Sequence, residues 1–438
     1  MKKKSFKKNV SWIFFGNLLH SILAFLINII VARYLSKDDY GNINYIASWV
    51  SFFNSFAILG INNVINKYLD DDQTESNNYL CSAMFARFVA SIISMVAIIL
   101  LVLILEKDNT KLIFITIIYS LSFVFEIGQL LVYWFRYKGE ADVVAILRII
   151  AFIASAIVKI IAIVLFRNIY LYIVGIVLET LLFSLFLIYK YNKKYCNKFE
   201  ISKNKISVIL KSSYPFISAH LLIVIYAQTD KIMLKRMMGA SNVASYTVAV
   251  TIAGLIATFT SAIIEGFRPE IISNFKKNKE LYLKRLKQLY CIIFWICICY
   301  STFITIFSKQ VILILYGKKY FSSIPALSII VWYTSLSYFG SVNNMYMVAE
   351  SKEKYVQLTT LVGAFTNILL NLLLIPKFGI SGAAIASLIT QFIANYLVVF
   401  IVKPLRPLSL IILNGLSPRN LGIGSLKESL LQLRRRYK

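Results

Sequence analysis

Long apolar runs separated by short charged stretches dominate the pattern of hydrophobic and polar positions along this chain. Each run has roughly 18 to 26 residues, close to the about 20 residues of helix that cross the hydrocarbon core of a bilayer. Helix is the expected state because lipid offers the backbone no hydrogen-bond partner. The runs are continuous, which excludes the short alternating segments of a membrane barrel. They cover residues 10–32, 43–65, 80–105, 112–135, 143–166, 169–189, 214–238, 246–265, 289–308, 324–349, 358–375 and 380–402.

The stretch 214–265 is similar in its polar pattern to the earlier stretch 10–65. In each stretch the second run carries polar residues at steps of three and four, which places them on one face of a helix. The first stripe consists of Ser48, Ser51, Ser55 and Asn62, and the second of Thr251, Gly254, Thr258, Ser261 and Glu265. The two polar stripes in an otherwise apolar chain predict a pathway between two similar halves.

The basic segment 190–213 is the longest polar break and divides the chain into halves of six runs each, 1–189 and 214–402. Because six is an even number, both halves are expected to insert with the same orientation, as in transporters built from parallel repeats. The segment 268–288 is predicted to be an amphipathic surface helix. The tail 403–438 is expected to be either an interfacial basic helix or a disordered tail.

Composition supports this interpretation, with 58% hydrophobic residues, 15% charged residues and a mean hydropathy of +0.71. The net charge of +27 does not indicate nucleic-acid binding, because the basic residues are unevenly distributed along the chain. The N-terminus, the even-numbered loops and the tail carry 32 of the 47 Lys and Arg residues, and the odd-numbered loops carry 11. The positive-inside rule therefore predicts a multi-pass membrane protein with both termini in the cytoplasm.

The loops leave no room for an extracytoplasmic catalytic domain. The sequence contains no P-loop and no GxGxxG motif, so nucleotide-driven transport within this chain is not expected. It has two histidines and five cysteines at no metal-like spacing, so neither a metal site nor a Ser/His/Asp site is expected. We therefore expect a carrier with no cofactor, rather than an enzyme.

Four sequence motifs resemble those of bacterial polysaccharide repeat-unit flippases (Wzx-type, for O-antigen or capsule), in the multidrug/oligosaccharidyl-lipid/polysaccharide exporter superfamily. The longest runs from Asn367 and Asn371 through Ile375-Pro376-Lys377-Phe378-Gly379-Ile380-Ser381-Gly382 to Ser387. The other three are the first loop Val31–Gly41, the segment from Asp230 to Tyr246, and Leu315–Tyr320. The presence of Pro376, Gly379 and Gly382 in this motif also has a physical explanation. Proline cannot continue a helix, and the glycines allow a tight turn and close helix packing.

The resemblance implies two six-helix bundles facing each other across a central cavity, which the polar stripes would line. It also implies that the cargo is an oligosaccharide linked to undecaprenyl pyrophosphate, moved by alternating access from the cytoplasmic to the outer leaflet. Membrane lipid, H⁺ or Na⁺, and the polysaccharide polymerase machinery are the further partners that it implies.

Charged residues inside the runs are the strongest candidates for a site, because each costs about 2.5–3.5 kcal/mol at mid-membrane and therefore usually faces a cavity or a partner. Arg148 and Lys231 are predicted to contact the pyrophosphate, with Arg87 and Lys159 as further cations. The polar residues expected to bind sugar are Asn62, Gln129 and Asn344. The acids that could carry a coupling ion are Asp230, Glu126, Glu179 and Glu265, and Asp230 is favoured because it lies in a family-like motif. His20 and His220 are expected to be neutral and hydrogen-bonded.

Three alternatives remain open at this point. Each cation could instead pair with an acid, and each polar residue could instead join helices. A multidrug or cation antiporter of the same fold would prefer an acidic cavity, whereas the charges here are balanced. A lipid II flippase is a closer rival.

Overall fold

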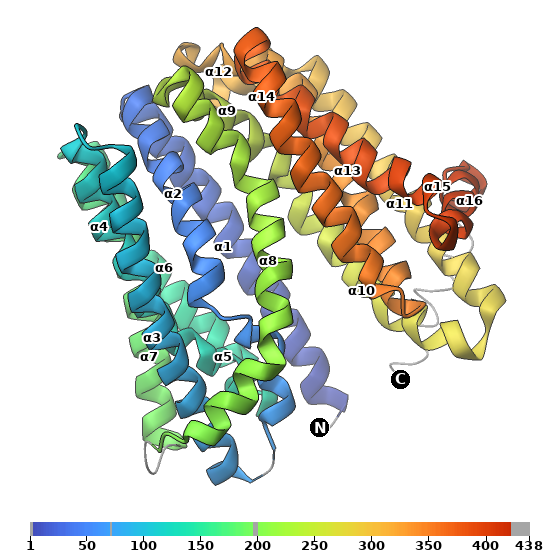
Figure 1. The fold of residues 1–438 in the computed structure, drawn as a ribbon, viewed down its shortest axis with the longest axis horizontal. Coiled ribbons are helices and arrows are strands. Elements are labelled where there is room, and N and C mark those ends of the chain that lie inside the picture. Colours follow the sequence, from blue (N-terminus) through green and yellow to red (C-terminus); the bar gives the residue numbers. More distant parts are fainter. Residues whose placement is uncertain (1–2, 71, 196–199, 422–438) are drawn as a thin grey trace. The chain divides into compact units, whose positions relative to one another are not determined.

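A computed structural model describes residues 3–70, 72–195 and 200–421 of the chain (Figure 1). These residues form helices joined by short turns, and no strand occurs among them. The helices of the first part are α1 (Lys3–Tyr34), α2 (Lys37–Ala57), α3 (Gln73–Leu105), α4 (Thr110–Phe125), α5 (Leu131–Tyr137), α6 (Ala141–Val164), α7 (Ile169–Lys194) and α8 (Lys203–Met238). Those of the second part are α9 (Ala240–Ala253), α10 (Ala257–Lys277), α11 (Lys279–Ile306), α12 (Ser308–Leu315), α13 (Ser323–Ala349), α14 (Glu353–Phe392), α15 (Val398–Ile401) and α16 (Arg406–Gly415).

The predicted membrane spans are confirmed as helices. Within the described residues, eight helical stretches are long and apolar enough to cross a membrane. One of these, Glu353–Ile401, is broken at Gly379 and contains the last two predicted runs. The helices α1, α2 and α13 cover the other three runs, so the all-α fold with twelve spans agrees with the prediction.

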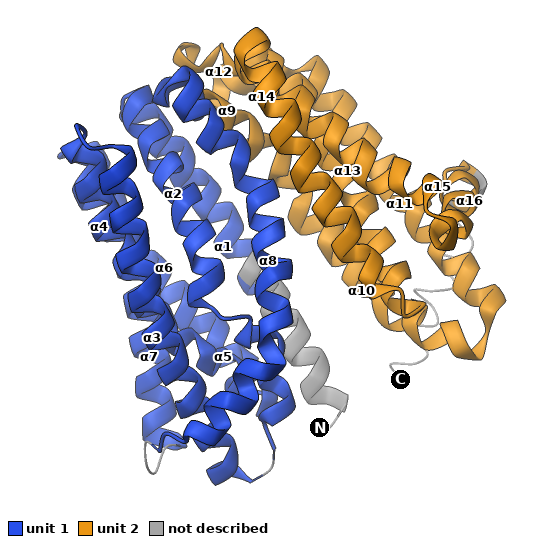
Figure 2. Ribbon diagram, in the orientation of Figure 1, with its two compact units in different colours: residues 1–244 blue, residues 245–438 orange. Residues whose placement is uncertain are grey.

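Contacts within the chain define two compact units, residues 1–244 and 245–438 (Figure 2). The sequence predicts the division between the two halves at the basic segment 190–213, and the contacts within the chain group α8 with the helices that precede it. Helix α8 belongs to unit 1 because it packs against α2 and α3. The division between the two compact units therefore falls after α8. The lysine-rich segment 190–213, in contrast, ends within the first part of that helix.

In each of the two similar stretches, a local sequence signal marks the turn between the two helices. Ser36 caps α2, with its side-chain oxygen accepting a hydrogen bond from the Asp39 amide at 3.0 Å. Gly239 ends α8 with a φ of +87°, a conformation that glycine adopts without a Cβ penalty. Both stretches therefore consist of two helices joined by a tight turn, as the matching pattern predicts.

The core of unit 1 holds large aromatic side chains. Trp134 and Phe135 of α5 are fully buried against α3, α6 and α7, and Tyr191 packs edge-on to Trp134 with ring centroids 5.9 Å apart. Tyr191 also donates a hydrogen bond of 2.8 Å to the side chain of Asn77. The short helix α5 is thereby fixed on its neighbours.

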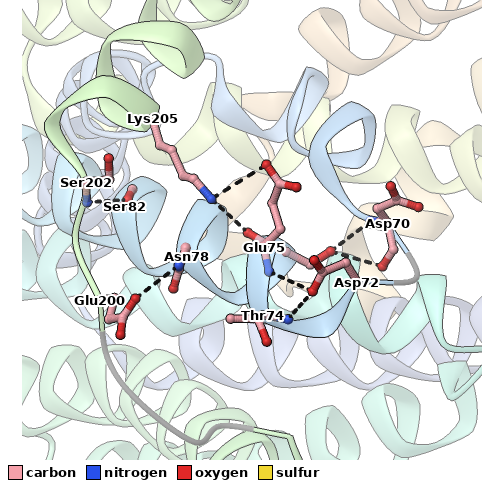
Figure 3. A network of polar contacts seen from close by, with 10 residues as sticks. Asp70, Asp72, Thr74, Glu75, Asn78, Ser82, Glu200, Ser202 and Lys205 are labelled. Carbon is pink, nitrogen blue, oxygen red and sulfur yellow. Dashed lines mark hydrogen bonds and ion pairs between the residues drawn. The ribbon is translucent and has the colours of Figure 1, made fainter.

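Polar contacts fasten the first turns of α8 to the beginning of α3 (Figure 3). Lys205 forms an ion pair of 3.8 Å with Glu75, the Ser202 amide donates to the hydroxyl of Ser82 at 3.0 Å, and Asn78 donates to Glu200 at 3.2 Å. The C-terminal part of the predicted linker is therefore structured and bound to unit 1.

Unit 2 contains the helix–turn–helix predicted from the longest motif. Gly379 has a φ of +57° and breaks the helix, and a Cβ on Gly382 would lie 2.2 Å from the carbonyl oxygen of Leu374. The predicted roles of both glycines are thus confirmed. The separate surface helix expected over 268–288 is wrong: α10 and α11 extend through that segment and meet at Asn278, whose side chain caps α11.

Candidate functional site

A polar pocket lies within unit 1, between α1, α6, α7 and the short 3₁₀ helix Glu126–Leu130 that connects α4 to α5. Its volume is about 240 Å³. The lining residues are His20, Gln129, Arg148, Glu179, Thr180 and Phe183. Arg148, Gln129 and Glu179 come from the set predicted from the sequence, so the fold gathers a predicted cation, amide and acid around one pocket.

Backbone packing places the amide of Gln129 in this pocket. The helix that begins as α4 changes to 3₁₀ geometry at Glu126, which turns the following residues toward α7. Gly128 allows the close approach, since a Cβ there would lie 2.9 Å from the Cβ of Ser184. The interruption of the span therefore positions Gln129.

Glu179 is the centre of a charged network on the pocket wall. Its carboxylate accepts a hydrogen bond from the Lys159 ammonium at 2.6 Å and from the Ser155 hydroxyl at 3.2 Å, and it lies 3.0 Å from Nε2 of His20. Gly175 leaves room for the stem of Lys159, whose Cγ would lie 2.8 Å from a Cβ at that position. Lys159 is thus a buried cation with an acid partner.

Arg148 enters the pocket from α6 with its guanidinium over the ring of Phe183, 5.0 Å from the ring centroid. At this distance the positive charge of Arg148 forms a cation–π contact with the ring. Glu179 and Arg148 line the same pocket, and their opposite charges attract each other. This geometry suits an arginine that presents N–H donors to an anionic group.

Arg87 of α3 belongs to a second polar cluster. Its Nη1 donates to the side-chain oxygen of Asn62 at 3.4 Å, and the charge of Glu126 attracts it. The Arg87 side chain is 3% exposed, and its Nε has no hydrogen-bond partner among the described residues. Three predicted site residues, Arg87, Asn62 and Glu126, are thus brought together.

The first polar stripe joins α2 to α8. Ser55 lies 3.0 Å from Nδ1 of His220, and the Ser48 hydroxyl donates to Gln228 at 3.1 Å. Gln228 also accepts a hydrogen bond of 3.3 Å from Lys231. Ser48 and Ser55 are fully buried. At these two positions the polar side chains join helices, which was the alternative to lining a pathway.

Asp230 and Lys231 are consecutive residues of α8. Asp230 is 6% exposed, Lys231 is half-buried, and their opposite charges attract each other. They lie on a different part of unit 1 from the residues that line the polar pocket.

The predicted residues of unit 2 are not gathered in this way. Glu265 of α10 is 60% exposed and forms a bidentate pair with Arg268, at 2.6 and 2.8 Å. Asn344 of α13 is exposed, whereas its neighbour Asn343 is buried and bonds to Tyr290 and to the backbone of Asn395. The sequence pattern selected Asn344, whereas the packing shows that its neighbour Asn343 is the buried residue of the two.

A larger cavity of about 630 Å³ lies within unit 2, between α11, α13, α14 and the residues that follow. Its lining is almost wholly apolar, with Phe294, Trp332, Phe339 and Phe392 among its residues. It lacks the charged donors that a phosphate requires, so the polar pocket of unit 1 is the better candidate for binding a charged group.

Thr180 and Phe183 are pocket residues that the sequence analysis did not select. Both lie within one helical turn of Glu179 on α7. Their position next to a charged residue inside a span is therefore the sequence signal that could have identified them. His20 was predicted to be hydrogen-bonded, and its contact with Glu179 agrees with that prediction.

Comparison with known proteins places these observations in a family. Residues 6–267, well over half of the chain, match the model of the family described as polysaccharide biosynthesis protein. The chain is also 24% identical over 399 residues to the capsular polysaccharide biosynthesis protein CapF of Staphylococcus aureus, covering 88% of this chain and 96% of that protein.

Solved structures of transporters share the fold. An inward-facing multidrug resistance MATE family transporter of the MOP superfamily aligns with a TM-score of 0.68 and 15% identity, over 89% of this chain and 96% of that one. The lipid II flippase MurJ, in an inward closed conformation, aligns with a TM-score of 0.69 and 16% identity, over 92% and 90%. At such identities the likeness establishes the fold, and it agrees with the superfamily predicted from the motifs.

Proposed function

This chain belongs to the polysaccharide biosynthesis protein family and has the fold of MOP-superfamily transporters, and on that basis we propose that it is a flippase for a lipid-linked oligosaccharide. The proposed cargo is a repeat unit on undecaprenyl pyrophosphate, moved by alternating access from the cytoplasmic to the outer leaflet of the bacterial cytoplasmic membrane. The product serves the synthesis of a surface polysaccharide such as a capsule or O-antigen, with polymerase machinery as the next partner.

The observation that carries this proposal is the pocket that holds Arg148 among membrane-spanning helices. An ionised phosphate costs tens of kcal/mol in bare hydrocarbon, so a flippase for a lipid diphosphate needs a polar, cationic surface inside the membrane. The guanidinium of Arg148, 5.0 Å from the Phe183 ring centroid, carries donors in the planar arrangement that suits phosphate oxygens. The polyprenyl chain remains in the apolar phase throughout.

We assign the other predicted residues to supporting roles in this proposal. Gln129 and Thr180 face the same pocket as Arg148 and would bind sugar hydroxyls. Arg87 with Asn62, and Lys231 on α8, would contact the headgroup along its path. Lys159 is engaged by Glu179, so its proposed role is to hold that acid in place. Asn344 is exposed on α13, so any contact that it makes with sugar would come from unit 2.

The driving force is proposed to combine the membrane potential with an ion. Two negative charges that move outward gain about 4–5 kcal/mol at 100 mV when the inside is negative. The acids proposed to bind H⁺ or Na⁺ are Asp230, Glu126, Glu179 and Glu265. Among them Asp230 is buried within a family-like motif, and Glu265 is exposed beside Arg268.

Translocation in proteoliposomes tests the proposal. Undecaprenyl-pyrophosphate-linked oligosaccharide is incorporated, and the access of a lectin to the opposite face is followed. Wild-type protein should give lectin access, and Arg148→Gln should reduce it to the background of empty vesicles, because the variant stays close in size but loses the charge. Lys190→Gln, an exposed change of the same charge near the end of α7, is the matched control and should behave as wild type.

Two further cargoes distinguish the alternatives. A fluorescent drug cation that moves while the glycan does not would assign the chain to a multidrug antiporter. Lipid II that moves faster than the repeat unit would assign it to peptidoglycan synthesis. Normal glycan flux by a well-expressed Arg148→Gln variant would contradict the role of Arg148.

A further inference from the structure

The apolar cavity of unit 2 is not used by the proposed function. Its volume of about 630 Å³ lies within the range of about 300–1,000 Å³ that is usual for ligand sites. Two polar side chains of its lining have partners in the surrounding helices. The Ser335 hydroxyl lies 2.6 Å from the Ser301 hydroxyl, and Nε1 of Trp332 donates to Thr305 at 3.2 Å. The cavity therefore offers a hydrocarbon surface, on which a polar ligand would find few partners.

The surroundings of the cavity supply hydrocarbon. The helices α11 and α14 are long and apolar enough to cross a membrane, so lipid chains lie beside them. Aromatic rings form much of the wall: Phe392 and Tyr396 stack with their centroids 5.7 Å apart, and Phe339 lies 5.7 Å from Tyr396. Such rings bury a large apolar area when a chain packs against them. An acyl chain of the membrane is thus the occupant that suits the lining.

One face of α11 leads from a basic surface into the cavity. Steps of three and four along the helix place five residues on this face: Lys284, Lys287, Cys291, Phe294 and Ile298. The lysines come first, at the end that the charge distribution predicts to be cytoplasmic. The last two residues line the cavity, and Phe294 follows Lys287 by about 10 Å along the helix axis. A phospholipid with its phosphate at the lysines would therefore have its acyl chain at the cavity.

The beginning of the C-terminal tail bounds the cavity at the same end. Residues 406–415 form α16, which packs against α11 (Figure 1). Leu416 lines the cavity, and the Cys291 thiol donates to the Ser417 carbonyl oxygen at 3.2 Å. The tail thus meets α11 where the basic part of its face changes to the apolar part.

The two lysines of this face differ from the arginine between them. Lys284 is exposed and Lys287 is half-buried, and no ion pair joins either to a carboxylate among the described residues. Arg285, in contrast, is buried, and its guanidinium donates to Glu270 at 2.9 Å and to Gln288 at 2.8 Å. Basic residues at the cytoplasmic ends of spans attract anionic lipid head groups. The two lysines supply the charge that such a head group requires.

We propose that unit 2 binds an anionic phospholipid, with an acyl chain in the apolar cavity and the phosphate group at Lys284 and Lys287. The occupant is a lipid of the surrounding membrane and not the transported substrate, so the inference stands apart from the proposed function. The bound chain fills the space between α11, α13 and α14, and the lysines select phosphatidylglycerol over the uncharged phosphatidylethanolamine.

Native mass spectrometry of the full chain in detergent tests the role of the lysines. The probes are phosphatidylglycerol and phosphatidylethanolamine with the same acyl chains, and undecaprenyl phosphate. Wild type should prefer phosphatidylglycerol. Lys284→Gln/Lys287→Gln should lose about ten- to thirtyfold in affinity for it, as expected for two basic residues at a membrane surface, and should bind phosphatidylethanolamine as before. The matched control is Lys276→Gln/Lys277→Gln, two exposed lysines in the last turn of α10, which should behave as wild type.

Fluorescence locates the acyl chain. Phosphatidylglycerol with brominated chains quenches tryptophans that the chains touch, and part of the quenching should disappear in Trp332→Phe, because Trp332 lines the cavity. Ile298→Phe fills part of the cavity and should weaken the binding of both phospholipids. Thermal unfolding of each variant shows that it is folded.

Three outcomes would overturn the inference. The first is equal affinity of wild type and folded Lys284→Gln/Lys287→Gln for phosphatidylglycerol. The second is quenching that Trp332→Phe leaves unchanged, since the chain would then lie elsewhere. The third is displacement of phosphatidylglycerol by an equal concentration of undecaprenyl phosphate, which would assign the cavity to the substrate chain. The translocation of glycan is measured separately, so a failure of the lipid site leaves the proposed function standing.

Discussion

At the scale of single residues, unit 1 is organised by charges that lie inside the membrane and have partners. Lys159 and Glu179 show the principle, with a separation of 2.6 Å and with the Lys159 side chain only 8% exposed. Removing one partner of such a buried ion pair lowers the free energy of unfolding more than replacing both partners by apolar residues does, because the remaining charge is left buried without an opposite charge. The pair also orients the wall of the pocket that holds Arg148.

The variant Glu179→Gln should therefore destabilise the protein by about 3 kcal/mol, the lower end of the usual range because the Glu179 side chain is 23% exposed. The double variant Lys159→Met/Glu179→Gln should recover much of this loss. Thermal unfolding in detergent, followed by tryptophan fluorescence, measures both. Equal unfolding temperatures for wild type and Glu179→Gln would show that the pair does not stabilise the fold.

At the scale of helices, glycines determine how closely the backbones approach. Gly41 and Gly382 show this most clearly, since a Cβ would lie 1.9 Å from the Ala240 carbonyl oxygen at the first position and 2.2 Å from that of Leu374 at the second. Small residues at such contacts are the usual means of packing helices in a membrane, where no hydrophobic force draws them together.

Gly382→Ala should thus force apart the two helices that meet at Gly379, at a cost of about 1–3 kcal/mol or more, because the obstructing atom is backbone. Gly266→Ala is the matched control. Gly266 lies in α10, and a Cβ there would have no neighbouring atom within 4 Å, so the change should stabilise that helix by about 0.5–1 kcal/mol. Unfolding temperatures of the two purified variants should move in opposite directions, and a parallel change would contradict the packing argument.

At the scale of the whole molecule, the distribution of Lys and Arg predicts how the twelve spans are oriented. The lysines at the two ends of the helices are suitable probes: Lys190 lies near the end of α7 and Lys276 in the last turn of α10, whereas Lys107 and Lys318 lie in odd-numbered loops. All four are exposed. The positive-inside rule places the first two in the cytoplasm and the other two outside.

Single cysteines at these positions, in a background without the five native cysteines, test the orientation. A membrane-impermeant maleimide added to intact cells should label Lys107→Cys and Lys318→Cys, and should label Lys190→Cys and Lys276→Cys only after the membrane is permeabilised. The reverse pattern would place both termini outside and would require the proposed direction of transport to be reconsidered.

The sequence alone determined the fold class, the twelve spans and the family. Apolar runs of membrane length must be helical in lipid, and Gly379 and Gly382 stand where a break and a close contact require them. These are local properties, so the pattern along the chain is sufficient to predict them. The sequence also identified Arg148, Gln129 and Glu179 as candidates, because a charged or amide side chain in an apolar run is itself an anomaly.

Only the tertiary structure decided which candidates belong together. It gathered Arg148, Gln129 and Glu179 around one pocket, placed Glu265 and Asn344 on exposed surfaces of unit 2, and grouped α8 with unit 1. It also added Thr180 and Phe183 to the lining of that pocket. The physical reason is that periodicity gives the face of a helix, whereas the neighbour of that face depends on which helices pack together over long separations in sequence.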